Sequence, residues 1–280
     1  NFDPSRLILI ENTAASSPAG YQGDLEISSL YITLDAYLNE NFRLAAGIRN
    51  EDGEQMVNTY DVFQIVDNNI EKIIDEEYTL PSFTLTYLPD FDENLQIRLG
   101  VSKTIARPTF RELSPTLFID VDTDRVISGS LYLENSEIDN IDLRVEYYWG
   151  FNQFLTAGLF FKDISKPIEE VVNESGDLII TSYQNVPSAE VTGFEIEYER
   201  IYEDLLPDSK WGSTKEFIFK MNFTATDSEV IYSDTDTYIN TQGSEINAAS
   251  LFANGRDTRL QGQSEEIANL QLGWDDLQNG

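Results

Sequence analysis

The residues best suited to binding a metal ion or a charged solute lie in one acidic stretch, DVDTDR (120–125). Its carboxylates, Asp120, Asp122 and Asp124, alternate as the oxygen ligands of a calcium loop do. An EF-hand also needs glycine at the sixth position and glutamate at the twelfth, where this chain has Arg125 and Leu131. The EF-hand hypothesis therefore fails. The pattern favours a solvated acidic loop, and we expect no metal site there.

No group of residues is typical of an enzyme active site. The chain has neither histidine nor cysteine, which excludes histidine acid–base catalysis, thiolate nucleophiles and the usual zinc sites. Carboxylates such as Glu195 and Glu197 resemble a glycosidase acid and base, but positions i and i+2 of one strand make no cleft. Phosphate-binding and dinucleotide motifs are also missing from the sequence. We therefore expect no enzyme activity and no cofactor.

The overall charge excludes one class of partner. The chain has 50 acidic and 18 basic residues, a formal charge of -32, so it lacks the basic surface that nucleic acids require. Hydrophobic residues make up 41 % of it, enough for a folded or lipid-facing structure. No apolar run reaches the length of a transmembrane helix.

The elements that must position these residues are strands, because polarity alternates with a period of two. In NLQIRLGVSKT, Leu95, Ile97 and Leu99 fall on one face, and Gln96 and Arg98 fall on the other. We expect residues 1–280 to form a single β segment of about nine strands. These strands are predicted over 24–38, 42–50, 78–88, 94–105, 141–149, 153–163, 190–200, 215–227 and 264–274.

The connections between these strands alternate between short and long. The short ones cover 39–41, 89–93, 150–152 and 202–214, and the long ones cover 51–77, 106–140, 164–189 and 228–263. Such alternation is typical of outer-membrane barrels, with short periplasmic turns and long extracellular loops. Trp149, Trp211 and Trp274 lie near the short turns, where an aromatic girdle would meet the membrane surface. The pattern favours an antiparallel transmembrane β-barrel.

These patterns leave open a soluble, acidic β-sandwich that binds carbohydrate or mediates adhesion at the cell surface. The two folds differ in where the same side chains lie. In a barrel, Leu99, Phe217 and Phe219 contact lipid, while Arg98 and Lys220 face an aqueous lumen. In a sandwich, the apolar side chains meet in a dry core.

Five blocks of sequence, in a fixed order, resemble a known family. They cover most of residues 95–274 and resemble the C-terminal half of TonB-dependent outer-membrane receptors. One of them, SGSLYL, replaces the commoner Gly-Asn-Pro-x-Leu, which leaves the conformation of that loop open. The blocks are SKTIARPTFRELSP (102–115), SGSLYLENSEIDNIDLRVEYYW (128–149), GLFFKDISKPIEEVV (158–172), YQNVPSAEVTGFEIEYER (183–200) and RLQGQSEEIANLQLGW (259–274).

The resemblance implies part of a barrel of about 22 strands whose lumen holds a plug domain. The plug and the terminal strands of the family are not found in this sequence. Nine strands alone would leave two edges with unpaired backbone groups, so we expect the chain to be a fragment of a longer protein.

The function that the resemblance implies is active uptake of a scarce, large solute across the bacterial outer membrane. That solute could be a ferric chelate, a cobalamin, a glycan or a peptide. The implied partners are a TonB-type energy-transducing complex acting through the plug region, outer-membrane lipid and a surface lipoprotein.

Two groups of residues are candidates for a role in such a receptor. The long loop after Arg107-Pro108 is the candidate for solute contact through Asp120, Asp122, Asp124 and Arg125. Proline cannot donate to a sheet, so Arg107-Pro108 is expected to mark the end of a strand. The family-motif residues with an expected structural role are Arg107, Pro108, Gly129, Glu146, Gly193, Gln261 and Gly262.

Overall fold

The computed structural model describes residues 20–60, 71–120, 125–175, 178–203, 215–250 and 259–276. Within them the chain is all-β, apart from the one-turn helix α1 (Phe110–Leu113) and the 3-10 helix η3 (Ala248–Ser250). No helix in this described part is long and apolar enough to span a membrane.

Nine long strands form one antiparallel sheet in the order β1-β2-β3-β4-β7-β8-β11-β12-β15. Each long strand pairs with the next long strand along the chain. The long strands are β1 (Gly20–Tyr37), β2 (Phe42–Tyr60), β3 (Glu71–Tyr87), β4 (Leu95–Ala106), β7 (Ser136–Gly150), β8 (Gln153–Ser165), β11 (Ser188–Glu203), β12 (Lys215–Ile231) and β15 (Glu266–Asp276). The shorter strands are β5 (Phe118–Ile119), β6 (Val126–Ile127), β9 (Ile168–Ser175), β10 (Leu178–Asn185), β13 (Thr237–Ile239) and β14 (Glu245–Asn247).

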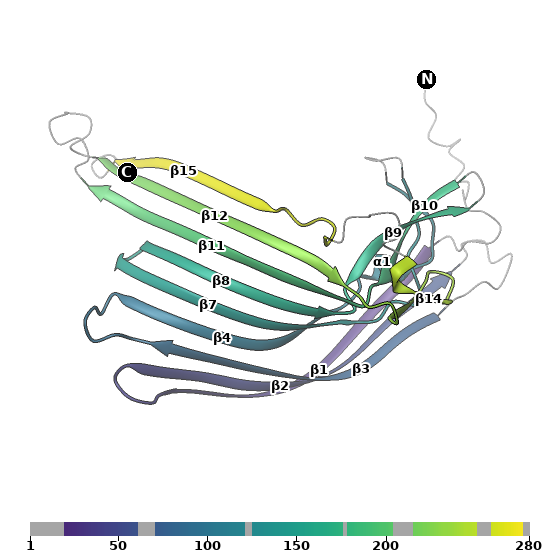
Figure 1. Ribbon diagram of the computed structural model, residues 1–280, viewed down its shortest axis with the longest axis horizontal. Coiled ribbons are helices and arrows are strands. Elements are labelled where there is room, and N and C mark those ends of the chain that lie inside the picture. The colour runs from purple at the N-terminus through teal and green to yellow at the C-terminus, as the bar shows by residue number, and fades with distance from the viewer. Residues whose placement is uncertain are drawn as a thin grey trace, which may run out of the picture.

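The long sheet is curved, and the shorter elements gather at one of its ends (Figure 1). β1 and β15 are its two edges and do not pair with each other in the described residues, so the barrel is not closed. The predicted fold class, an antiparallel all-β barrel segment, is confirmed.

The outer face of the sheet is apolar. We call the face against which α1 packs the inner face, and the opposite one the outer face. The strand register sets Leu99, Leu143, Leu159 and Phe194 side by side in one row across the outer face. Leu159 is 59 % exposed and Leu143 41 %, so no second layer of the described residues covers this row. A sandwich would bury these side chains, so this finding argues against the soluble alternative.

The neighbouring row, on the inner face, is charged. Arg98 pairs in register with Arg144, which in turn faces Gly158 and then Glu195. Because Gly158 has no side chain, the Arg144 guanidinium crosses above it to the Glu195 carboxylate. The polarity of the two faces is therefore opposite, as the period-two alternation predicted.

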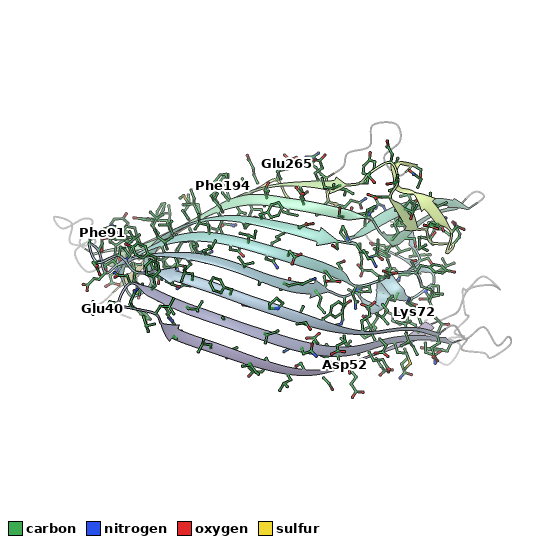
Figure 2. The ribbon with its side chains drawn as sticks, turned by 60° about the horizontal axis from the view of Figure 1, so that its bottom comes forward. Glu40, Asp52, Lys72, Phe91, Phe194 and Glu265 are labelled. Atoms are coloured by element: carbon green, nitrogen blue, oxygen red, sulfur yellow. The ribbon has the colours of Figure 1, made fainter. Side chains whose placement is uncertain are left out.

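The short turns lie at the end of the sheet remote from the shorter elements. Figure 2 labels Glu40 and Phe91 at this end and Lys72 at the other. The Asn39 side chain accepts hydrogen bonds from the backbone N–H groups of Asn41 and Phe42, both at 2.9 Å. This Asx turn fixes the tight reversal between β1 and β2.

The loops at the opposite end are folded, which the sequence analysis did not expect. β5, β6, β10 and β9 form a small four-stranded sheet within the long connections 106–140 and 164–189. Leu113 of α1 and Leu133 pack with Val57 and Ile74 on the inner face of β2 and β3, and all four are buried. This cluster holds the folded loops against the inner face.

The largest extensions beyond the predicted strands are those of β2 and β3. β2 continues to Tyr60 and β3 begins at Glu71, although 51–77 was expected to be a loop. The extension was not predicted because its outer side chains are mostly polar and its inner face mixes buried polar residues, such as Glu51 and Gln55, with Val57 and Ile74. The sequence of this extension therefore lacks the regular alternation of apolar and polar residues that indicates a strand.

Aromatic side chains cluster near the short turns on the outer face. The Trp149 ring lies 5.6 Å from that of Tyr198, which lies 5.7 Å from that of Phe219. The Arg200 guanidinium sits 5.0 Å from the Trp149 ring. Trp211 lies outside the described residues.

Gly129 provides a test of how the folded loops are packed. A Cβ atom there would lie 2.6 Å from the carbonyl oxygen of Arg111 and nearer still to those of Glu112 and Ser114. We expect Gly129→Ala to destabilise the docked helix by about 1–3 kcal/mol through overpacking. Trypsin cleavage of the intact protein after Arg111 should therefore accelerate about tenfold for each 1.4 kcal/mol by which the docked helix is destabilised.

The matched control is Gly100→Ala, because the nearest atom to a Cβ there lies at 3.8 Å, an ordinary contact. Equal cleavage rates in the two variants would contradict the packing described for Gly129.

Candidate functional site

Arg107 anchors the loop that follows β4. Its Nη2 lies 2.5 Å from Oε1 of Glu51 on β2, and this carboxylate is 7 % exposed. Arg49 Nε donates to the other oxygen of Glu51 at 2.8 Å. Two guanidinium groups thus neutralise one buried carboxylate, and the bond from Arg107 connects the end of β4 to β2, two strands that the sheet itself does not pair.

The residues after Arg107 direct the chain toward the inner face. β4 ends at Ala106, and the buried Pro108 carbonyl accepts a hydrogen bond from Gln55 Nε2 at 2.7 Å. Thr109 then caps α1: its Oγ1 accepts from the Glu112 N–H at 3.3 Å, and the Glu112 carboxylate accepts from the Thr109 N–H at 2.7 Å. This segment is packed rather than a free external loop.

The acidic stretch of the same loop is only partly described. The Asp120 N–H donates to the Arg125 carbonyl at 2.9 Å, and Asp122 and Asp124 lie outside the described residues. Arg125 Nη1 approaches the Glu170 carboxylate on β9 at 3.8 Å, and both side chains are largely exposed. The described residues contain no group of three or more carboxylates placed to hold a metal ion.

Glu146 is the centre of an ion-pair network on the inner face. It is 2 % exposed and lies 3.2 Å from Nη2 of Arg98 and 4.0 Å from Nη1 of Arg144. The Tyr148 hydroxyl donates to it at 3.1 Å, and Arg144 also pairs with Glu195. Each charge in the network therefore has a partner of opposite sign.

Gly193 and Gly262 serve the backbone in different ways. A Cβ atom on Gly193 would lie 2.6 Å from the Ala225 carbonyl oxygen and nearer still to the Phe160 ring. Gly193 therefore allows a close approach between β8, β11 and β12. Gly262 has φ of +73°, a left-handed conformation that other residues rarely adopt.

Gln261 joins the segment before β15 to the β9–β10 hairpin. Its N–H donates to the Glu169 carboxylate at 3.2 Å, and its side-chain amide donates to the Glu170 carbonyl at 2.9 Å. The Leu260 N–H donates to Ser228 Oγ on β12 at 3.2 Å. These bonds close a cavity of about 680 Å³ between the hairpin, the inner face of β12 and residues 259–265.

The cavity changes the ionisation of one of its carboxyl groups. Burial raises the pKa of Glu169, and the nearby Glu170 charge adds to this rise. The hydrogen bond from the Gln261 backbone acts in the opposite direction and reduces the rise in pKa. Glu169 therefore keeps its proton to a higher pH than an ordinary glutamate does.

The comparisons with known proteins agree with this architecture. The model of the family described as TonB dependent receptor-like, beta-barrel, matches residues 4–280. The chain belongs to this family. The resemblance expected from the five sequence blocks is confirmed.

The fold of this receptor chain is shared with a solved structure. The siderophore receptor PiuA from Acinetobacter baumannii aligns with a TM-score of 0.59 and 14 % identity, covering 90 % of this chain and 31 % of its own. The siderophore receptor PirA from Pseudomonas aeruginosa aligns with a TM-score of 0.47 and 14 % identity, covering 74 % and 43 %. This chain thus spans about a third of the length of PiuA. A search among curated proteins found no match.

The hairpin that supplies the cavity of this receptor was missed by the sequence analysis. The sequence ESGD (174–177) covers the end of β9 and the two residues before β10, and its Ser-Gly pair is a turn signal that could have indicated the hairpin. Thr109-x-x-Glu112 is likewise a capping box that could have indicated α1. No sequence pattern brings Gln261 to Glu169, because the contact joins residues distant in the sequence.

The Arg107–Glu51 pair yields a prediction about the folded loop. Arg107→Gln leaves the buried Glu51 with only one of its two cations, so the docked loop should lose about 1–3 kcal/mol. Hydrogen exchange at the Leu113 amide, which bonds to the Thr109 carbonyl, should accelerate accordingly. A double-mutant cycle with Glu51→Gln should give a coupling of about 0.5–3 kcal/mol.

The control for this cycle is Arg43→Gln, which removes an exposed pair with Asp35 on the same face. It should leave exchange at Leu113 unchanged. A coupling of zero between Arg107 and Glu51 would show that the pair does not hold the loop.

Glu169 yields a prediction about pH. Its folded-state pKa is raised above the ordinary value of 4.5, so its contribution to stability is present below that value and is lost as pH rises through the raised pKa. Glutamine does not ionise, so the Glu169→Gln variant does not lose this stability as the pH rises. We expect the variant to gain thermal stability relative to the native receptor as pH rises from about 4 to about 8. A stability difference that stays constant across that range would contradict the raised pKa.

Proposed function

We propose that this chain forms part of the membrane-spanning wall of a receptor that imports a scarce, large solute across the bacterial outer membrane. A TonB-type complex would supply the energy through the plug region of the receptor. The observation that carries the proposal is the opposite polarity of the two faces of a single-layered sheet.

The outer face has the character of a lipid-facing surface. Its row of Leu99, Leu143, Leu159 and Phe194 is uncovered, and in water such a face would be a severe aggregation hazard. In an outer membrane the same row would contact hydrocarbon, and the aromatic cluster around Trp149 would lie at the interface. Outer-membrane lipid is therefore a proposed partner.

The inner face has the character of an aqueous lumen. Arg98, Arg144, Glu146 and Glu195 form ion pairs there. Charged side chains at this depth need such partners and water, which a solute pathway provides.

The folded loops provide the surface for solute capture. They gather at the end opposite the short turns, the extracellular end in barrels of this kind (Figure 1). Asp120, Asp122, Asp124 and Arg125 belong to this region and remain proposed solute contacts. PiuA is a siderophore receptor, but its 14 % identity to this chain supports only a shared fold. The net charge of -32 disfavours an anionic ferric chelate as the solute.

Uptake can be tested by comparing cells with and without the receptor gene. We expect at least one large solute to disappear from the medium only in cells that carry the gene. Its depletion should stop when an uncoupler removes the proton-motive force. Profiling of the spent medium by mass spectrometry measures both effects, and identical profiles would refute the proposal.

Two variants connect this uptake to the membrane wall. Leu143→Arg places a charge on the outer face, at a cost of about 2–4 kcal/mol at the bilayer centre, and should remove the receptor from the outer membrane. Asp142→Arg places the same charge on the inner face and should assemble normally. Equal assembly of both variants would show that the outer face does not contact lipid.

A further inference from the structure

The cavity of about 680 Å³ at the loop end has the size of a site that binds one segment of a larger solute. Three segments far apart in sequence build it: the β9–β10 hairpin, the inner face of β12 and residues 259–265. Its walls are tied together by Gln261 to Glu169 and by Leu260 to Ser228. The cavity therefore has fixed walls.

The strongest sign of a ligand is a pair of amide groups without partners. Gln184 lines the cavity and is 4 % exposed, and its Nε2 finds no hydrogen-bond partner among the described residues. In the same part of the chain, Gln263 Oε1 is buried and also lacks one. Buried polar groups are nearly always hydrogen-bonded, so a donor and an acceptor without partners beside one cavity, both shielded from solvent, call for a molecule that the two side chains meet by turning toward it.

The donor and acceptor together indicate a ligand with the chemistry of a peptide group. A backbone amide offers a carbonyl to Gln184 and an N–H to Gln263, which a purely acceptor-bearing anion does not. The apolar part of the wall consists of Val171 together with Val186, Val230 and Leu260, of which the last three pack in one cluster. Such a wall suits an aliphatic side chain. The lining residues include no aromatic ring on which a sugar or a base could stack.

The charge of the cavity selects among peptides. Glu169, Glu170 and Glu265 line it, and the only cation among the lining residues is Arg259, which pairs with Glu265. An acidic peptide would meet these carboxylates at close range, whereas a basic side chain would gain from them.

We propose that this cavity binds a short peptide segment with aliphatic and basic side chains. The inference rests on the proposed function, because it names the class of solute that the receptor captures before uptake. Gln184 and Gln263 hold the peptide backbone, the valine and leucine side chains contact an aliphatic residue, and the carboxylates attract the basic ones.

The test uses the intact receptor purified in detergent and three capped probes with a fluorescent label. These are the tripeptide Lys-Val-Lys, the tripeptide Glu-Val-Glu and the sugar maltotriose. Fluorescence anisotropy should show saturable binding of Lys-Val-Lys, at least about tenfold weaker binding of Glu-Val-Glu and none of maltotriose. Equal binding of the two peptides, or tighter binding of maltotriose, would overturn the inference.

A variant of Gln184 tests the site itself. Gln184→Leu removes the unpaired amide while nearly keeping its volume, so the receptor should remain folded and bind Lys-Val-Lys about tenfold more weakly, as expected for one lost hydrogen bond. The matched control is Gln271→Leu on the inner face of β15, away from the cavity, which should bind normally. If Gln184→Leu unfolds, Gln184→Met supplies the second test: it is also close in volume and uncharged, it loses the donor, and it too should weaken binding. Unchanged binding in the folded Gln184 variants would overturn the inference.

The outcome separates this inference from the proposed function. Lys-Val-Lys that binds the receptor but is not depleted by energised cells would support the peptide site and contradict uptake. Energy-dependent depletion of another solute by a receptor that binds no peptide would support uptake and refute the peptide site.

Discussion

Pairing of every long strand with the next one along the chain determines which side chains share a row. Because side chains alternate along each strand, this register collects Leu99, Leu143 and Leu159 on one face and Arg98 and Arg144 on the other. A slip of one residue between any two strands would place a guanidinium among leucines. The polarity of both faces, and everything packed on them, depends on keeping this register.

The sequence predicted the parts of the fold that this alternation controls and missed the parts that it does not. The middle of each long strand has one apolar and one polar face, so strands such as 153–163 were visible. The extension of β2 past Asn50 lacks a clear alternation, because its inner face mixes buried polar side chains such as Glu51 and Gln55 with Val57, which packs against the folded loops. The family resemblance was expected from five sequence motifs, and the family match over residues 4–280 confirmed it. Neither depends on the conformation of the loops.

The candidate site was less predictable because its contacts join distant residues. Arg107 was expected to end a strand, and β4 does end directly before it, but its pairing with Glu51 crosses 56 residues of sequence. Gln261 meets Glu169 across 92 residues, and the hairpin between them was not foreseen. Of the residues singled out first, Asp122 and Asp124 lie outside the described residues, and Arg125 approaches Glu170, which is distant in the sequence. The acidic loop is recognisable in the sequence by its many charged residues, whereas the cavity is formed by packing between segments that are distant in the sequence.

The ion pairs around Glu146 have a consequence for anything that moves along the inner face. Arg98 and Arg144 share Glu146, and Arg144 also reaches Glu195 over the bare surface of Gly158. The wall therefore presents dipoles rather than isolated charges, and its potential falls off within a short distance. In the proposed uptake, a basic solute released from the acidic loops would therefore find no deep electrostatic minimum on this stretch, as passage through a pore requires.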